Sequence, residues 1–393
     1  MKTLRVSSNN LKESTIQFIA ALMFFLLIFM KVSPQIKGVC EIALIIMGTA
    51  VYFHYLMKMK NKMYRVFSIV LIIVVMYMMN ILIVREGSIV ELIKLIFVHF
   101  PIAVAVVFSE SRNKCIWKSL FWMTAIFLLS RILFVDHYRI FDDTSSNMVS
   151  IYMIIVLFLL EYKRCENLKV VSSPQLVYYV TVLILSMLSQ GRMGIIVSAV
   201  LFCISVYLKY FVSGSERVKN RIIKQVGILF GVCVAVTYVS LNMMELVNKY
   251  FPRFTSTNLY DTASSNAIRA EFLMDYFNGC KNPLNFIFGL DFATTSELAR
   301  YEGGNVHNTF LMIHSYLGIF ALLCVIIISI KCVMILKKNR QYSLLMIILL
   351  FFMRVTTDYC SPGNVGDVFI LSMILICMKY KYERKNRCLK EEQ

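Results

Sequence analysis

Residues 66–84 read VFSIVLIIVVMYMMNILIV and contain no charged side chain. A transmembrane α-helix needs about 20 consecutive apolar residues to cross the hydrocarbon core of a bilayer. Arg65 and Arg85 bound the stretch, so its length meets that requirement. It therefore predicts a membrane-spanning helix, and similar stretches lie before and after it.

The composition of the whole chain agrees with a membrane location. Of its 393 residues, 59% are hydrophobic and 16% are charged, and the mean hydropathy is +0.69. Soluble domains are about 45–50% apolar and about 25% charged. A soluble globule cannot hide so much apolar surface, and a disordered chain contains far less of it. We therefore expect an all-α polytopic integral membrane protein.

Apolar segments of this kind recur along the chain and predict about twelve transmembrane helices. They lie near residues 16–30, 38–57, 66–84, 89–108, 115–135, 148–162, 176–189, 193–212, 222–242, 306–330, 343–357 and 366–380. This places nine helices in residues 1–242 and three in residues 306–380. Residues 243–305 are then one large extracytoplasmic loop, and residues 381–393 are a cytoplasmic tail.

The basic residues give the orientation of these helices. Cytoplasmic loops of membrane proteins carry an excess of Lys and Arg. In this chain the basic residues gather before the first span and in alternate loops, at Lys2–Lys12, Lys58–Arg65, Arg112–Lys118, Lys163–Lys169, Lys209–Lys224, Lys331–Arg340 and Lys379–Lys390. The net charge of +18 is therefore a topology signal, and we expect both termini in the cytoplasm and no nucleic-acid partner.

The extracytoplasmic loop has helical signals of its own. Ser264–Asn266 can cap a helix, and Ile268, Phe272 and Tyr276 recur at helical spacing. Asn278-Gly279 would end this helix. A loop of this length in a compact protein is usually functional. We therefore look for binding and catalytic residues in and around it.

Ionisable residues inside the spans are costly in a membrane and mark function by default. The clear cases are Glu41, Glu91, Lys94, Arg131 and Arg354. Glu91 and Lys94 are three residues apart, so local pairing is the structural alternative. Arg131 has no charged neighbour on its helix, which favours a place in a donor-binding cavity. Arg354 lies near the outer end of its span, with Asp358 beyond it.

The turn Ser189–Arg192 joins two predicted spans on the outer side. A lone Arg beside a helix start suits a phosphate, because its guanidinium donates two parallel hydrogen bonds and the helix terminus adds amide groups. The alternative is an interfacial anchor. Arg269 in the loop helix could be a second cation, or it could face solvent. Both residues are candidates for a diphosphate-binding site.

The segment Val306–Leu311 reads VHNTFL and is the strongest local signal. His307 can act as a general base near neutral pH, with Asn308 and His314 as supporting residues. We expect His307, Leu311 and His314 to share a helical face, which places the two histidines about 10.5 Å apart, too far for two ligands of one zinc ion. We find no nucleotide-binding or metalloprotease motif, so we expect no metal and no cofactor. The cysteines show no CxxC spacing, and a disulfide between Cys280 and Cys360 stays open.

Residues 189–322 together resemble the O-antigen ligase and polymerase superfamily of bacterial surface polysaccharide assembly. That family has a small-residue-plus-Arg turn, a long loop with an internal Arg, an N-P-L…G segment, and H-N-T-x-L before a span with L-G-I. The corresponding residues are Ser189–Arg192, Arg269, Asn282–Leu284 with Gly289, His307–Leu311 and Leu317–Ile319. The first half of the chain is similar to the family only in hydropathy and span number.

The resemblance implies a GT-C-like, metal-independent glycosyltransferase in the bacterial inner membrane. Its donor would be an oligosaccharide on undecaprenyl diphosphate, with Arg192 and Arg269 on the diphosphate and His307 as the base. A chain-length regulator and a flippase would be its partners. We favour a polymerase of repeat units, for O-antigen or capsule. The alternatives are a ligase that transfers polymer to lipid A-core and a lipid-linked oligosaccharide flippase.

Overall fold

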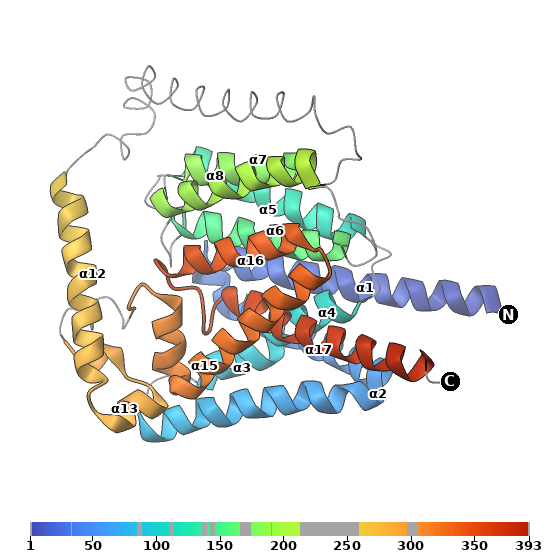
Figure 1. The fold of residues 1–393 in the computed structure, drawn as a ribbon, viewed down its shortest axis with the longest axis horizontal. Coiled ribbons are helices and arrows are strands. Elements are labelled where there is room, and N and C mark those ends of the chain that lie inside the picture. Colours follow the sequence, from blue (N-terminus) through green and yellow to red (C-terminus); the bar gives the residue numbers. More distant parts are fainter. Residues whose placement is uncertain are drawn as a thin grey trace, which may run out of the picture.

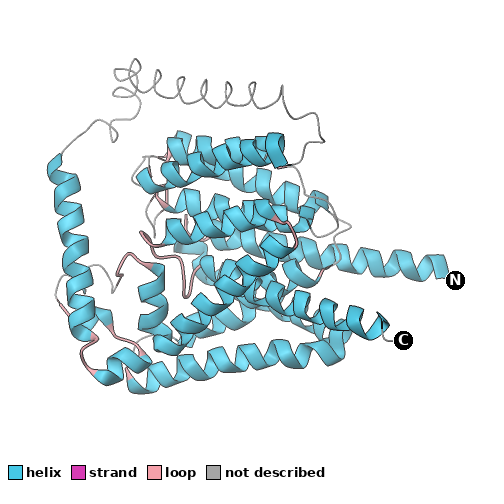
Figure 2. Ribbon diagram, viewed as in Figure 1, coloured by secondary structure: helices cyan, strands magenta, loops and turns pink. Residues whose placement is uncertain are grey.

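The computed structural model describes residues 2–32, 34–84, 89–109, 114–135, 140–141, 146–165, 174–189, 191–212, 259–296, 300 and 305–391. These residues are almost entirely helical, and no strand occurs among them (Figure 2). Seven helical stretches among the described residues are long and apolar enough to cross a membrane. The expected all-α fold and the presence of several membrane-length helices are confirmed for these residues.

The N-terminal part of the bundle follows the predicted spans closely. Its helices are α1 (Lys2–Phe29), α2 (Lys37–Ile83), α3 (Ile89–Lys94), the π-helix η2 (Leu95–His99), α4 (Phe100–Phe108), α5 (Lys114–Phe134), α6 (Met148–Cys165), α7 (Leu176–Leu188), α8 (Arg192–Tyr207) and the π-helix η4 (Leu208–Val212). The predicted span at residues 222–242 lies outside the described residues, and the total of twelve stays a prediction.

The C-terminal part consists of loop helices and three further helices of the bundle. They are α12 (Leu259–Gly279), α13 (Pro283–Phe288), the short 3-10 helix η5 (Phe292–Thr294), α15 (Thr309–Lys338), α16 (Tyr342–Val355) and α17 (Gly366–Glu391). Helix α12 ends at Gly279 as predicted, but it begins at Leu259, so Ser264–Asn266 lie inside the helix and do not cap it.

Helix α2 contains two predicted spans and reverses direction between them. The rings of Tyr52 and Phe67 lie 6.2 Å apart and stack. Fifteen residues of straight helix would separate them by about 22 Å. The chain therefore folds back between these two residues, which is where the sequence predicts a loop at Lys58–Arg65.

Helices α4 and α6 form the centre of the bundle. Residues 149–164 of α6 and residues 100–107 of α4 are buried on every face. A helix that is apolar all round belongs in the interior of a helical protein. Helices α2 and α15 instead expose many large apolar side chains, as expected of surfaces that face lipid.

The two ends of the bundle differ in character. Both termini lie at one end, and α12 and α13 lie at the opposite end, where α12 runs across the bundle (Figure 1). We refer to the end with both termini as the terminal end and to the end with α12 and α13 as the loop end. Having both termini at the same end agrees with the predicted topology, and the assignment of that end to the cytoplasm rests on the basic residues.

Helix α15 turns sharply near its start. Gly318 has φ 78° and ψ 177°, so Thr309–Leu317 forms a short segment that points away from the rest of the helix (Figure 1). Gly289, at φ 111°, ends α13 beside this turn. A Cβ at Gly318 would collide with the backbone of Ile287 and Phe288, and one at Gly289 with the carbonyl of Ser315. The two glycines therefore allow the end of α13 and the turn in α15 to touch backbone to backbone.

We expect Gly318→Ala to destabilise the protein by about 1–3 kcal/mol, because only glycine populates this backbone region and the added methyl group has no space. The measurement is thermal unfolding of the purified protein in detergent. Gly38→Ala is the matched control, since nothing lies within 4 Å of a Cβ at Gly38 in the first turn of α2. Equal melting temperatures for the two variants would contradict this role of Gly318.

Candidate functional site

His307 lies at the loop end, two residues before α15 begins. Its backbone is left-handed, with φ 53°, and its N–H donates to Oδ1 of Asn305 at 2.8 Å. Its ring stacks on Phe272 of α12, with 6.1 Å between the centroids and 23° between the planes. Positive φ is uncommon outside glycine, and strain of this kind gathers at functional sites. The backbone geometry thus supports His307 as a candidate functional residue.

The neighbours of His307 have architectural roles. Asn308 is the N-cap of α15, and its Oδ1 accepts hydrogen bonds from the N–H groups of Phe310 and Leu311 at 2.9 and 3.2 Å. The Thr309 hydroxyl donates to the carbonyl of Asp358 at 2.7 Å. Because the helix begins only at Thr309, His307 does not share a helical face with His314, and that expectation is wrong.

Arg269 lies on the face of α12 that meets His307. Arg269, Phe272 and Tyr276 are spaced three and four residues apart, so they follow one face of the helix. Phe272 and Tyr276 are buried against the start of α15, and Arg269 is half-buried one turn away. Within the described part of the chain, Arg269 makes no ion pair. The structure therefore places Arg269, which has no ion-pair partner among the described residues, on the same face of α12 as Phe272, the residue that His307 contacts.

His314 is held on both sides of its ring. Its Nε2 lies 2.8 Å from the carbonyl of Phe286, and its Nδ1 lies 2.5 Å from the hydroxyl of Tyr276. A carbonyl can only accept, so Nε2 carries the proton. The Tyr276 hydroxyl also lies 2.9 Å from the carbonyl of Leu311, and it contacts Nδ1 and this carbonyl with its single proton. The His314 side chain is 4% exposed. His314 thus ties α12 and α13 to α15, which is a positioning role.

We expect Tyr276→Phe to destabilise the protein by about 1–3 kcal/mol, because it removes the hydroxyl that contacts both Nδ1 of buried His314 and the carbonyl of Leu311. The loss should appear as a lower melting temperature and as faster proteolysis of the α12 segment in detergent. Phe277→Leu is the matched control, since this neighbouring side chain is 60% exposed. Proteolysis of Tyr276→Phe at the control rate would count against this tether.

Arg354 is a buried link between three segments, and its side chain is 1% exposed. Its Nη1 donates to Oδ2 of Asp358 at 2.5 Å, its Nε to the hydroxyl of Ser150 at 3.0 Å, and its Nη2 to the carbonyl of Asn147 at 2.9 Å. Nη1 also reaches the hydroxyl of Thr357. With its donors engaged in this way, Arg354 holds α16 against the start of α6 and has a positioning role.

Arg192 is the first residue of α8, and its side chain lies outside the described part of the structure. The backbone beside it packs closely on α6: a Cβ at Gly191 would meet Asn147, and one at Gly194 would meet Ser150. Ser150 accepts from Arg354, and Arg354 binds Asp358. Since Asp358 accepts from Thr309, a continuous series of contacts joins the start of α8 to the start of α15.

Two candidates from the sequence have partners elsewhere. Lys94 forms an ion pair with Glu41 of α2 at 2.6 Å, whereas Glu91 accepts from the hydroxyl of Tyr77. The local pairing of Glu91 with Lys94 is therefore replaced by a contact between helices. The Nε of Arg131 donates to the carbonyl of Ile140 at 3.2 Å. This contact braces the loop after α5, and the place of Arg131 in a donor-binding cavity stays a prediction.

Asn80 is a residue of this region that the motifs do not mark. This residue is fully buried, and its Nδ2 donates to the carbonyls of Phe288 and Ser315 at 2.8 and 2.9 Å. It thereby clamps the junction of α13 and α15 to α2. The signal was a lone amide in the apolar stretch 66–84, which a buried environment tolerates only if the amide is hydrogen-bonded.

A second polar cluster lies beside the loop end. Nδ1 of His99, in the π-helix η2, lies 3.0 Å from Oδ2 of Asp367, and both side chains are buried. Asp367 also accepts from the hydroxyl of Ser361 and the N–H of Gly363. His99 thus has a buried acidic partner on α17. Cys280 and Cys360 are both free thiols, so the disulfide left open by the sequence is not formed.

No family model, no curated protein and no solved structure matches this chain. The resemblance to the O-antigen ligase and polymerase superfamily therefore rests on the motifs and their order. The GT-C-like fold likewise stays a prediction.

Proposed function

We propose that this protein is a glycosyltransferase that polymerises oligosaccharide repeat units carried on undecaprenyl diphosphate. One observation carries the proposal most: the motif residues, scattered between residues 269 and 319, gather at the loop end of the bundle. His307 contacts the face of α12 that holds Arg269, and the N-P-L…G and L-G-I segments meet through Gly289 and Gly318. The polymer would belong to O-antigen or capsule.

In the proposed reaction, His307 accepts the proton of an acceptor hydroxyl. The hydroxyl oxygen forms a bond to the anomeric carbon of the donor, and the bond from that carbon to the diphosphate oxygen breaks. Attack opposite the leaving group inverts the anomeric carbon. The diphosphate leaves as an anion on its lipid, and Arg192 and Arg269 stabilise the charge that develops on it.

The remaining site residues support this geometry. Asn308 caps the helix behind His307, and His314 and Arg354 position α12, α15 and the start of α8. A lipid diphosphate is already an activated donor, so the proposal needs no nucleotide, cofactor or metal. Lys94 and Arg131 contact α2 and the loop after α5, and we assign them no direct step.

The proposal places the enzyme in the bacterial inner membrane, with both termini in the cytoplasm and the loop end outside. A flippase would supply the lipid-linked unit at that face, and a chain-length regulator would set the length of the product. The apolar helices supply the lipid-facing surface that such a location requires.

The test is a polysaccharide ladder gel of a strain that lacks the gene, with and without plasmid-borne wild type. Collapse of the ladder to a single repeat unit is the expected result. Full-length polymer stranded on undecaprenyl diphosphate would instead show a ligase. Absence of any repeat unit on the outer face would show a flippase, and either of these outcomes would overturn the proposal.

A further inference from the structure

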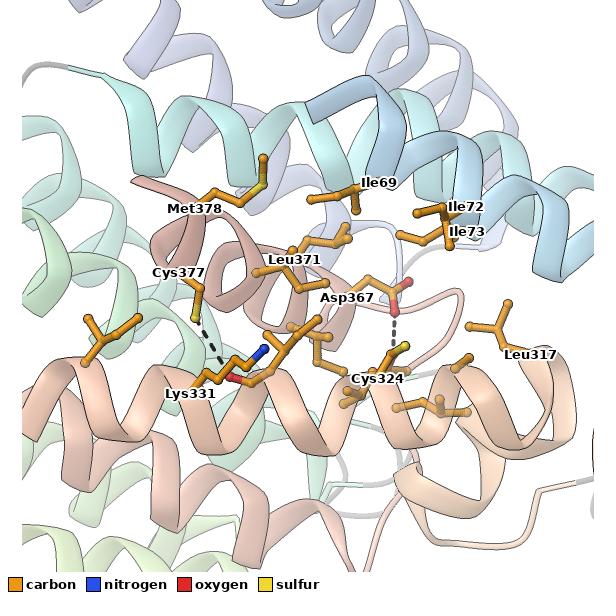
Figure 3. Close-up of a pocket in the computed structure, with 18 of the residues that line it drawn as sticks. Ile69, Ile72, Ile73, Leu317, Cys324, Lys331, Asp367, Leu371, Cys377 and Met378 are labelled. Atoms are coloured by element: carbon orange, nitrogen blue, oxygen red, sulfur yellow. Dashed lines mark hydrogen bonds between the residues drawn. The ribbon is translucent and has the colours of Figure 1, made fainter. Parts of the chain in front are cut away.

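An apolar groove runs along the outside of the bundle between α2, α15 and α17, and its volume is about 960 Å³. Its walls include Ile72 and Ile73 of α2, Cys324 and Ile328 of α15, and Leu371 and Met378 of α17. Figure 3 shows these three helices facing one another across it. Because α2 and α15 also expose large apolar side chains around it, the groove lies where acyl chains of the bilayer would meet the protein.

The positive and negative side chains that line the groove lie toward opposite ends of it. Lys331, Lys338 and Lys381 line it toward the terminal end, and Lys331 points from α15 into it (Figure 3). Asp367 is the one acid among its lining residues and lies toward the loop end, where Ser361 and His99 contact it. None of the three lysines forms an ion pair within the described residues. The groove thus joins an apolar channel to three lining lysines that form no ion pair with a described acid.

We propose that this groove binds an anionic phospholipid of the leaflet at the terminal end, with an acyl chain along the apolar walls and the phosphate among the three lysines. An apolar groove alone would accept any lipid, but the lysines favour a headgroup with net negative charge. A diphosphate bound at the loop end would meet Asp367 instead of these cations. This lipid site is therefore separate from the candidate site at His307 and does not depend on the proposed function.

The experiment uses the purified full-length protein in a neutral detergent. Phosphatidylglycerol and phosphatidylcholine are titrated separately, and bound lipid is counted by native mass spectrometry. We expect phosphatidylglycerol to bind at least tenfold more tightly. The triple variant Lys331→Gln, Lys338→Gln and Lys381→Gln should weaken its binding about a hundredfold, at roughly fivefold for each lysine near a charged headgroup.

A matched triple variant separates this site from general surface charge. Lys114→Gln, Lys118→Gln and Lys337→Gln removes the same net charge from lysines that do not line the groove, and it should bind phosphatidylglycerol like the wild type. A second variant, Cys324→Trp, fills the groove at an exposed position and leaves the lysines in place. We expect it to weaken phosphatidylglycerol binding at least tenfold.

Three results would overturn the proposal. Equal binding of phosphatidylcholine and phosphatidylglycerol would mean that the lysines select no headgroup. Unchanged binding by Cys324→Trp would mean that no chain occupies the groove. Undecaprenyl phosphate binding tenfold more tightly than phosphatidylglycerol would assign the groove to the carrier lipid.

Discussion

Replacing His307 with asparagine is expected to abolish polymer formation and to leave the amount of protein in the membrane unchanged. Loss of a general base lowers an enzymatic rate by a factor of about 10² to 10⁴. Asparagine tolerates the left-handed backbone at φ 53° better than alanine does, so this variant removes the imidazole with the least strain. The measurement is the polysaccharide ladder of the gene-deleted strain that carries the variant.

A matched histidine variant controls for this experiment. His54→Gln changes a histidine that contacts Glu13, a residue near the N-terminus on α1, and the ladder should keep its full length. Arg269→Ala and Arg192→Ala should shorten the ladder as His307→Asn does, because each would remove charge stabilisation from the leaving diphosphate. A full ladder from His307→Asn would show that this residue is not the base.

Replacing Arg354 with methionine is expected to deplete the folded protein itself. Removal of one partner of a buried ion pair costs about 3–5 kcal/mol, because the other charge stays buried without compensation. In this protein the change leaves the Asp358 carboxylate, the Ser150 hydroxyl and the Asn147 carbonyl without their common donor. The variant should show a low yield in membranes and a clearly lower melting temperature in detergent.

The double variant Arg354→Met and Asp358→Leu separates structure from chemistry. Removing both charges is often close to neutral for stability, so the double variant should recover much of the lost protein. If Arg354→Met is instead as stable as the wild type but makes no polymer, Arg354 belongs to the donor site, and the positioning role assigned here is wrong.

The elements that were predictable from the sequence are those set by local pattern. Unbroken apolar stretches such as 66–84 predicted the helices, and Asn278-Gly279 predicted the end of α12, because both signals act within a few residues.

The contacts between distant segments were not predictable in this way. Lys94 has a neighbouring acid at helical spacing but pairs with Glu41 of another helix, because helix packing decides which side chains meet. The sequence likewise identifies Gly289 and Gly318 as motif positions without explaining why they are glycine. The explanation is that the backbones of α13 and α15 touch at these residues, and this contact exists only in the folded chain.

The clamp made by Asn80 constrains the order in which the protein can assemble. Its partners Phe288 and Ser315 follow it by 208 and 235 residues. Contacts this distant in sequence form late, since a long intervening chain must first be synthesised and inserted. During that interval the Asn80 amide has no native partner. Biogenesis of the loop end therefore finishes only after α15 enters the membrane, so ribosome-bound chains that stop before Thr309 should carry an incomplete site on an otherwise inserted N-terminal half.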